Sequence, residues 1–198
     1  MKRVFDLIAS LIGLLTFSLF IAVIVIIIRK EDKGAAFYRG LRVGRYGKQF
    51  RIFKFRTMVV DAEKVGISST AEDDPRITKI GRFLRKYKLD ELPQLINVLK
   101  GEMSVVGPRP QVPWAVELYS EEERKLLSVR PGITDYASIK FRNEGNILKN
   151  SSNPDEDYLK KIAPEKIRLG LEYVNNNNMC VDLRIILATI GALLHKGD

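Results

Sequence analysis

The longest uncharged stretch of the chain runs from Leu7 to Ile28, 22 residues without an acidic or basic side chain. As a helix, at about 1.5 Å per residue, it is long enough to cross the ~30 Å hydrocarbon core of a bilayer. No small-residue cleavage pattern of the A-x-A type follows it, which disfavours a signal peptide. The length therefore favours membrane insertion over a buried helix of a soluble protein.

Basic residues stand at both ends of this apolar run, Lys2 and Arg3 before it and Arg29 and Lys30 after it. Basic flanks usually stay on the cytoplasmic side, so a straight span leaves one pair unexplained. A helix that bends and returns to the same face satisfies both. Gly13, Thr16 and Ser18 are candidate positions for the bend, because the segment has no proline and these residues offer flexibility or side-chain bonds to the backbone.

We therefore expect a re-entrant membrane helix over residues 1–30 and a cytosolic domain over residues 31–198. A straight span is the alternative. The bend itself is expected between Gly13 and Ser18.

The charged and reactive residues narrow the chemistry of the remainder. Lys and Arg number 33 against 24 Asp and Glu, a net charge of +9 that suggests an anionic partner: nucleic acid, a phosphorylated substrate or a membrane surface. The chain has one Cys and one His, so an internal disulfide is excluded, and a Cys/His zinc cluster and a Ser-His-Asp triad nearly so. Catalysis would then rest on carboxylates, Lys, Arg or a metal with oxygen ligands.

The periodicity beyond the apolar run predicts a compact α/β domain, mostly α, with short strands and amphipathic helices at the membrane interface. Phe37 to Phe55 is typical of a strand pair with a turn at Gly44-Arg45-Tyr46-Gly47, and residues 66–74 are typical of a polar loop. The last predicted helix is either a core or an interfacial helix. The predicted helices are Ile77 to Tyr87, Glu91 to Leu99, Val112 to Leu127, Pro164 to Tyr173 and Val181 to Leu194.

Two adjacent carboxylates, Asp90 and Glu91, begin the second of these helices, just after a cluster of Arg and Lys residues. The cations should keep both carboxylates ionised, and such a pair in a basic pocket suits a divalent metal and a phosphate together. The alternative is an ordinary N-cap at Asp90 followed by a solvated Glu91. From the spacing alone, the N-cap is the stronger interpretation.

Three other segments could contact phosphate. In Gly107-Pro108-Arg109-Pro110 the prolines stiffen the backbone around a guanidinium that can grip phosphate through two hydrogen bonds. Lys54 and Arg56 share one face of a strand, and the turn after Arg130 leads to Arg142. Each segment could equally be a plain turn or a solvated edge. Neither a Walker A pattern nor G-x-G-x-x-G occurs.

Taken together and in this order, the central motifs resemble those of the bacterial sugar transferase family, the monotopic phosphoglycosyl transferases. The resemblance extends from about Arg3 to Thr189 and makes Asp90 and Glu91 look catalytic. The motifs that carry it are Lys54-Phe55-Arg56-Thr57-Met58, Asp74-Pro75-Arg76-Ile77-Thr78, Leu89-Asp90-Glu91-Leu92-Pro93-Gln94-Leu95, Asn97-Val98-Leu99-Lys100-Gly101-Glu102-Met103-Ser104 and Val106-Gly107-Pro108-Arg109-Pro110.

The resemblance implies a reaction and its participants. Such enzymes transfer a sugar 1-phosphate from a UDP-sugar to polyprenol phosphate, usually undecaprenyl phosphate, and release UMP. It implies that Asp90 is the nucleophile of a covalent phosphosugar intermediate, that Glu91 supports metal and proton handling, and that Asp90 and Glu91 hold Mg²⁺. It further implies a place at the inner (cytoplasmic) membrane, with the catalytic domain facing the cytoplasm and membrane lipids as partners. The residues expected at phosphate or nucleotide are Lys54, Arg56, Arg85, Pro108, Arg109, Pro110 and Arg142.

The chain departs from the family at several positions. Ser18 is followed by Leu19 where the family commonly has Ser-Pro, and Asp135-Tyr136-Ala137-Ser138 stands where Gly-Leu-Ala-Gln is usual. A second hypothesis is a silent membrane scaffold, which would have no need of the Asp90–Glu91 pair. Nucleic-acid binding is disfavoured, because the apolar helix has no role there. The sequence names neither the sugar nor the pathway, and it leaves a homo-oligomer open.

Overall fold

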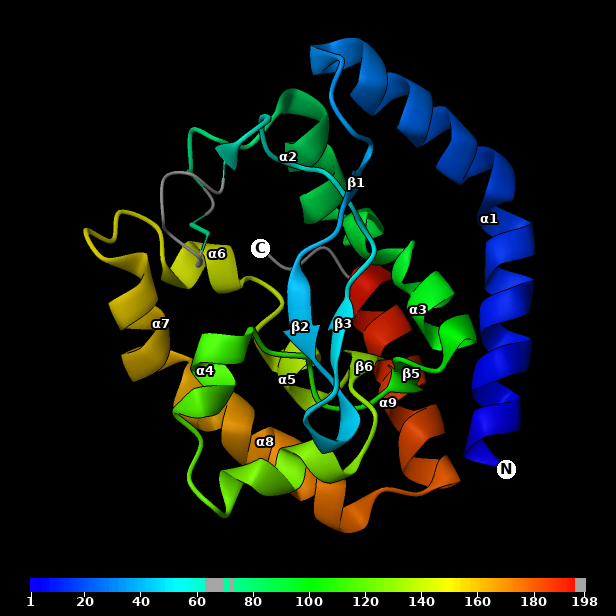
Figure 1. Ribbon diagram of the computed structural model, residues 1–198, viewed down its shortest axis with the longest axis vertical. Coiled ribbons are helices and arrows are strands. Elements are labelled where there is room, and N and C mark those ends of the chain that lie inside the picture. The colour runs from blue at the N-terminus through cyan, green and yellow to red at the C-terminus, as the bar shows by residue number, and fades with distance from the viewer. Residues whose placement is uncertain (63–69, 72, 195–198) are drawn as a thin grey trace.

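The computed structural model describes residues 1–62, 70–71 and 73–194 (Figure 1). It is mostly helical, with three short two-stranded sheets in the described ranges, as the sequence predicts. Part of the predicted polar loop at 66–74, and His195, lie outside the described residues. The elements around the site and the N-terminus are α1 (Lys2–Asp32), β1 (Phe37–Tyr38), β2 (Leu41–Val43), β3 (Gln49–Arg51), β4 (Lys54–Phe55), α2 (Lys79–Lys86), η3 (Leu89–Glu91), α3 (Gln94–Lys100), β5 (Ser104–Val106) and β6 (Gly132–Thr134).

Helix α1 covers the predicted apolar segment and is bent. Its two halves, Lys2–Thr16 and Ser18–Glu31, meet at an angle of 61°. The hydroxyl of Ser18 donates a 2.8 Å hydrogen bond to the carbonyl of Leu15, a contact of the kind that often bends helices. The predicted position of the bend, between Gly13 and Ser18, is confirmed. In the described part of the chain, neither half alone is long and apolar enough to cross a bilayer; the bent pair together meets the length and composition required.

The N-terminal end of α1 is fastened to the rest of the protein by charged side chains. The ammonium group of Lys2 donates to the carbonyl of Val106, to the hydroxyl of Tyr173 and to the carboxylate of Asp182, at 3.0, 3.1 and 2.5 Å. The buried carboxylate of Asp6 accepts from the hydroxyl of Ser104 and from the neighbouring backbone N–H. Both contacts hold β5, so the start of α1 lies against this strand.

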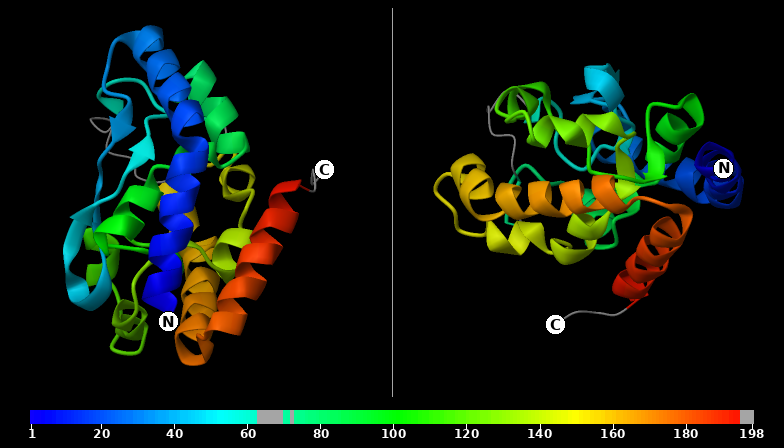
Figure 2. Two further views of the ribbon diagram at one scale, coloured as in Figure 1. Left: turned by 90° about the vertical axis from the view of Figure 1, so that its right-hand side faces the viewer. Right: turned by 90° about the horizontal axis from the view of Figure 1, so that it is seen from below.

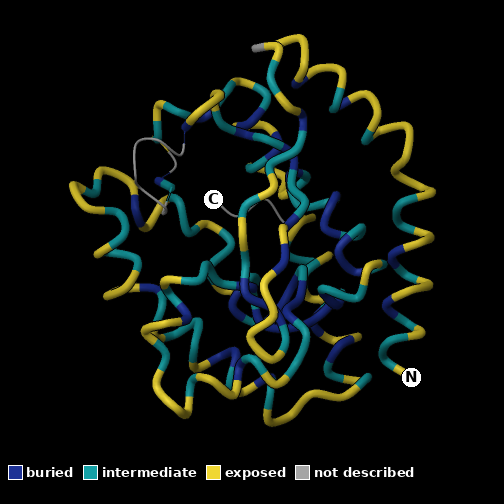
Figure 3. The backbone as a smooth tube through the Cα atoms, in the orientation of Figure 1, coloured by how far each residue is buried: buried dark blue, intermediate teal, exposed yellow. Residues whose placement is uncertain are grey.

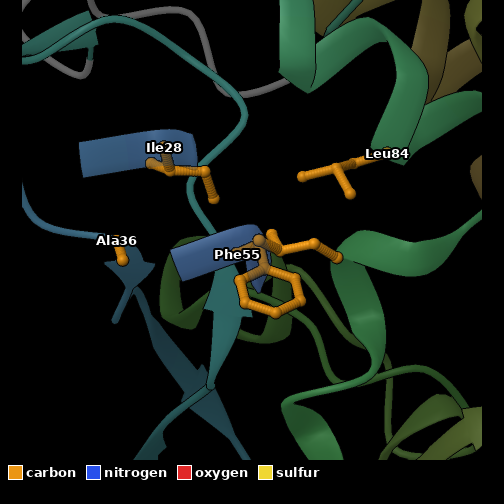
Figure 4. Packing of buried hydrophobic residues seen from close by; sticks show 5 residues of the cluster. Ile28, Ala36, Phe55 and Leu84 are labelled. Carbon is orange, nitrogen blue, oxygen red and sulfur yellow. The ribbon is translucent and has the colours of Figure 1, made fainter. Parts of the chain in front are cut away.

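The C-terminal half of α1 is fastened by apolar packing instead. Ile24 and Ile28 form a buried cluster with Ala36, Phe55 and Leu84 (Figure 4). These residues come from α1, the segment after it, β4 and α2. The middle of α1 is exposed: Leu15, Phe17, Leu19 and Phe20 are more than a third accessible, and exposed residues follow its outer side (Figure 3). Helix α1 is therefore anchored at both ends and presents an apolar bend between them.

The strands confirm the predicted hairpin and add one pair that the sequence analysis missed. Phe37 pairs with Phe55 in the β1–β4 ladder and Arg42 with Phe50 in the β2–β3 ladder, both antiparallel, around the predicted turn at 44–47. Strands β5 and β6 pair in parallel. Beyond this pair, a Cβ on Gly132 would lie 2.1 Å from the backbone N of Gly107. The two backbone segments can approach this closely only because both residues are glycine.

The other helices agree in part with the prediction. The helices predicted at 77–87, 164–173 and 181–194 correspond to α2, α8 (Ala163–Asn176) and α9 (Met179–Leu194). The single helix predicted from Val112 to Leu127 is wrong, because the chain forms α4 (Pro113–Glu117), a turn and the 3-10 helix η4 (Glu123–Ser128). Here Ser120 and Glu123 exchange side-chain-to-backbone hydrogen bonds that begin a new helix. Three short helices were not predicted: α5 (Tyr136–Lys140), α6 (Glu144–Ile147) and α7 (Pro154–Lys161).

Helix α9 lies on the side of the molecule away from the β2–β3 pair, with α1 between them in the side view (Figure 2). Its Asp182 and Ile185 are buried, whereas Leu183, Leu187 and Ile190 are 45% to 69% exposed. Of the two predictions for this helix, a helix enclosed in the core is therefore excluded, because most of its large apolar residues are at the surface.

Candidate active site

The carboxylate pair stands on a tight 3-10 turn that faces the first hairpin. The turn, Leu89–Glu91, follows Lys88, whose φ of 55° reverses the chain after α2. No side-chain capping bond is formed at the start of this turn or of α3. The N-cap interpretation of Asp90 is therefore wrong, and Asp90 is 92% buried without the partner that a cap would give it.

Glu91 is held by two cations from different parts of the chain. Lys54, on β4, donates a 2.9 Å hydrogen bond to Glu91 Oε1. Arg109, in the loop after β5, donates from Nη2 to Oε1 at 2.5 Å and from Nη1 to Oε2 at 3.2 Å. This is the two-pronged geometry that favours arginine over lysine. Both oxygens of Glu91 are thus engaged.

The two carboxyl groups respond to burial in opposite directions. Burial alone would raise the pKa of Glu91, but the charges and hydrogen bonds of Arg109 and Lys54 hold it well below its ordinary value. Burial raises the pKa of Asp90, against the opposing charges of Lys54 and Arg85. Lys54 is affected in turn, because burial lowers the pKa of its ammonium group. Glu91 is therefore a fixed anion, and Asp90 is a more basic carboxylate.

Asp90 has little direct support for its charge. Its Oδ2 is 3.9 Å from Lys54 Nζ, at the edge of ion-pair distance. Its Oδ1 is buried and has no hydrogen-bond partner among the residues that the structure describes. An unpaired buried oxygen costs about 1–3 kcal/mol, so its presence calls for a functional reason.

The other predicted phosphate-binding residues lie at different distances from the pair. Arg85 donates to the hydroxyl of Thr57 at 2.8 Å, and its charge acts on Asp90. The guanidinium of Arg56 lies over Gly34, just beyond α1, so Lys54 and Arg56 diverge although they share a strand face. Arg142 donates to the carbonyl of Ala192 near the end of α9. The structure thus brings Lys54, Arg85 and Arg109 to the pair and places the guanidinium of Arg56 beside Gly34.

The two prolines around Arg109 fix its position. Pro108 and Pro110 are buried while Arg109 between them is half-buried. The carbonyl of Pro108 accepts a 3.0 Å hydrogen bond from Gly132 N. The loop is therefore attached to β6, and the guanidinium points at Glu91 from a constrained backbone.

A cavity of about 360 Å³ opens beside Glu91 and Arg109. It extends between α4, α5, α8 and α9 and is lined mostly by apolar residues, with a few polar groups converging on it, as ligand pockets usually are. Among its walls are three aromatic side chains and three further cations: Tyr119, Phe141, Tyr158, Lys88, Arg142 and Lys166.

The carboxylates fit a Mg²⁺ ion unequally. Asp90 offers an oxygen without a partner, whereas Glu91 would have to give up Lys54 or Arg109. In the described ranges, no group of three His, Cys, Asp or Glu side chains could hold a metal. Asp90 alone suits the usual arrangement for Mg²⁺, in which one or two carboxylates act together with substrate phosphates and water.

Several residues at the site were not singled out by the sequence analysis. Gln94 is 99% buried, and both polar atoms of its side chain lack a partner among the described residues. Lys166 pairs with Glu144 on the wall of the cavity. The position of Gln94 one turn after the carboxylate pair was a usable signal. Lys166 and Glu144 are far apart in the sequence, and no local pattern indicated that they would pair.

Comparison with known proteins identifies the family. The bacterial sugar transferase family matches residues 1–196. The chain belongs to the bacterial sugar transferase family. It is 40% identical to galactosyl transferase CpsE of Streptococcus agalactiae over 98% of the chain. It is 36% identical to exopolysaccharide production protein ExoY of Rhizobium meliloti over 100% of the chain. It is 34% identical, over 96% of the chain, to UDP-glucose:undecaprenyl-phosphate glucose-1-phosphate transferase of Escherichia coli.

The relatives differ in how much of their own length this chain matches. The match covers 87% of ExoY but only 42% of CpsE and 39% of the Escherichia coli protein. The chain therefore corresponds to nearly all of some family members and to less than half of others.

The opposite pKa shifts predict opposite effects of neutralising the two carboxylates. Glu91 has a lowered pKa, so its charge stabilises the fold above about pH 4.5, and this stabilisation is lost as the pH falls through the folded value. Asp90 has a raised pKa, so stability falls as the pH rises from about 3.8 through the folded value. At pH 7, Glu91→Gln should lower Tm by roughly 6–15 °C, because Lys54 and the half-buried Arg109 lose their shared counter-ion. Asp90→Asn should raise Tm.

Thermal unfolding followed at several pH values tests this pair. The deficit of Glu91→Gln should shrink as the pH falls below about 4.5, because the unfolded chain takes up a proton at Glu91 there while folded Glu91 is still charged. A Tm loss of similar size in Glu91→Gln and Asp90→Asn would contradict the conclusion that the charge of Glu91 stabilises the fold and that of Asp90 destabilises it.

Proposed function

We propose that the protein transfers a sugar 1-phosphate from a UDP-sugar to polyprenol phosphate, undecaprenyl phosphate in the bacterial case, and releases UMP. One observation carries the proposal: a buried carboxylate with an unpaired oxygen, Asp90, stands beside a Glu91 fixed by Lys54 and Arg109 at a cavity of about 360 Å³. Membership of the sugar transferase family supports it, and so do relatives named for UDP-glucose and undecaprenyl phosphate.

In the proposed first step, Asp90 attacks the β-phosphorus of the donor. A bond forms from the carboxylate oxygen to phosphorus, the bond from phosphorus to the bridging oxygen breaks, and UMP leaves with the electron pair. Burial favours this role, because a carboxylate with a raised pKa is a better nucleophile than an exposed one. In the second step an oxygen of the lipid phosphate attacks the same phosphorus and displaces Asp90.

Glu91, Lys54 and Arg109 act around this reaction by charge and position. Lys54 and Arg109 supply positive charge for the diphosphate, and Glu91 holds both cations in place beforehand. Such prearranged charges stabilise a transferring phosphoryl group without reorganisation during the reaction. Bound Mg²⁺, held by Asp90 and the diphosphate, would offset the remaining negative charge. The cavity beside Arg109 would receive the rest of the donor.

We further propose that α1 is a re-entrant membrane helix and that the catalytic domain faces the cytoplasm. Lys2 is paired with buried Asp182, and Ile28 is in the core with Phe55, so both ends of α1 lie on the domain. A helix with both ends on the same side must enter and leave the same face of a bilayer. Its exposed apolar bend around Phe17 would then lie deepest in the lipid.

The reaction is tested by incubating the protein in vesicles with a panel of UDP-sugars and polyprenol phosphate. We expect UMP release with at least one donor and, with donor alone, a covalent adduct visible by mass spectrometry of the intact protein. Asp90→Asn should abolish both, because an amide lacks the anionic oxygen, while its Tm stays at or above the wild-type value. UMP release by Asp90→Asn at a near-normal rate would rule out the nucleophile.

The proposed metal requirement predicts that a chelator stops UMP release and that added Mg²⁺ restores it. Because the protein alone offers Asp90 and not three ligands in its described residues, the chelator should leave the Tm of the substrate-free protein unchanged. Full activity in excess chelator would refute the requirement for Mg²⁺.

The topology is tested with cysteines probed by a thiol reagent that does not cross membranes. Cys180 is exposed, so the background variant is Cys180→Ser. Val4→Cys reports on the exposed N-terminal turn of α1, and Lys48→Cys is the matched control on the domain surface. In intact cells neither should react, and after permeabilisation both should. Reaction of Val4→Cys alone in intact cells would show a straight span.

A further inference from the structure

Gln94 is a buried polar side chain whose own hydrogen-bonding groups are unused. It is 1% exposed, and neither its amide nitrogen nor its amide oxygen has a partner in the described part of the chain. Burying an amide without hydrogen bonds is unfavourable, and a leucine of similar volume would avoid this cost. A polar residue in this position therefore serves something other than the stability of the core.

The backbone places Gln94 close to the carboxylate pair. Leu92 and Pro93 have right-handed helical dihedral angles, so the 3-10 turn that carries Asp90 and Glu91 leads directly into α3. Residues three and four apart on a helix share one side. Gln94 follows Glu91 by three positions and Asp90 by four, so it lies about one turn after the pair.

The next polar residue on this side shows where that side faces. Asn97, three positions after Gln94, accepts from the backbone N of Phe53 and donates to the carbonyl of Arg51. These are the residues that lead into β4 and Lys54. Gln94 therefore lies between the structural contact of Asn97 and the site at Asp90.

Asp90 and Gln94 leave complementary groups unused. Asp90 Oδ1 is a buried acceptor without a donor, and Gln94 Nε2 is a buried donor without an acceptor among the described residues. Glu91 already accepts three hydrogen bonds from Lys54 and Arg109, whereas Asp90 Oδ1 accepts none in the described residues, so Asp90 is the carboxylate that needs a donor. Two orphaned groups of opposite kind, one helical turn apart, are explained together if they meet during the reaction.

We infer that Gln94 is a positioning residue for Asp90: its amide N–H donates to Asp90 Oδ1 when the donor is bound, so that Oδ2 is presented to the β-phosphorus. This inference rests on the proposed function. The hydrogen bond persists through the first step, in which Oδ2 becomes bonded to phosphorus and Oδ1 becomes the carbonyl oxygen of the acyl phosphate. Gln94 itself touches neither the donor nor the lipid.

The decisive variant is Gln94→Leu, because a structural role and a positioning role predict different combinations of effects. As a positioning residue, Gln94 should be replaceable with Tm unchanged or raised, since unpaired polar atoms leave the core. Meanwhile kcat should fall on the order of 10- to 100-fold, the effect of one hydrogen bond to a charged group. KM for the donor should stay within about twofold, because Gln94 makes no contact with it. Formation of the covalent adduct from donor alone should slow by the same factor.

Gln94→Glu tests whether the side chain of Gln94 acts as a hydrogen-bond donor or as an acceptor. It keeps the shape and the acceptor oxygens but removes the N–H, so its kcat should fall at least as far as that of Gln94→Leu. Gln49→Leu, on the exposed face of β3, is the matched control and should behave as the wild type. A wild-type kcat in Gln94→Leu or Gln94→Glu, or a parallel loss of Tm and kcat in Gln94→Leu, would overturn the inference.

Wild-type activity keeps the two proposals distinguishable. If the wild type releases UMP and Gln94→Leu does so equally fast, the positioning role fails and the function stands. If the wild type releases UMP with none of the donors, the proposed function fails and the positioning role fails with it.

Discussion

The fastening of the first residues of α1 to β5 is the constraint on which the rest of the arrangement depends. Lys2 brings its charge to buried Asp182 and to the carbonyl of Val106, and Asp6 binds Ser104. An unpaired Asp182 carboxylate at 1% exposure would cost several kcal/mol, so this end of α1 cannot leave the domain cheaply. The other end is fixed by apolar packing, so both ends of the bent helix lie on the domain, and exposed apolar residues follow it from Val4 to Ile27.

A second consequence concerns how charge is distributed at the carboxylate pair. Lys54 and Arg109 converge on Glu91, and their charges and hydrogen bonds compensate its buried carboxylate. Asp90 is left next to it with a charge that burial opposes and few contacts to stabilise it. The neighbours differ because Lys54 and Arg109 both donate hydrogen bonds to Glu91, whereas Lys54 Nζ is 3.9 Å from Asp90 Oδ2. The charge of Glu91 thus stabilises the fold, whereas the charge of Asp90 destabilises it. Active sites commonly contain groups that lower the stability of the fold in this way.

Local features of the sequence predicted what local physics determines. The apolar run, the bend near Ser18, the hairpin around 44–47 and the amphipathic helix now seen as α2 all depend on neighbouring residues and were found. The β5–β6 pair was missed because its strands are three residues each and are joined by a long connection, and the Val112 to Leu127 helix was overextended because a capping exchange at Ser120 interrupts it. At the site, the motifs identified Lys54, Arg85 and Arg109, but only the fold shows that Arg56 turns toward Gly34.

The same contacts connect the apolar helix with the carboxylate pair. Asp6 and Lys2 hold Ser104 to Val106 from one side, and the loop that begins after Val106 carries Arg109 to Glu91. The strand between them is three residues long and is paired with β6, so it has little freedom to absorb a shift. The N-terminal end of α1 and the loop that carries Arg109 are therefore attached to the same short strand. In a protein that meets its lipid phosphate at a membrane surface, as we propose, this strand would join the inserted helix to the loop that carries Arg109 to Glu91.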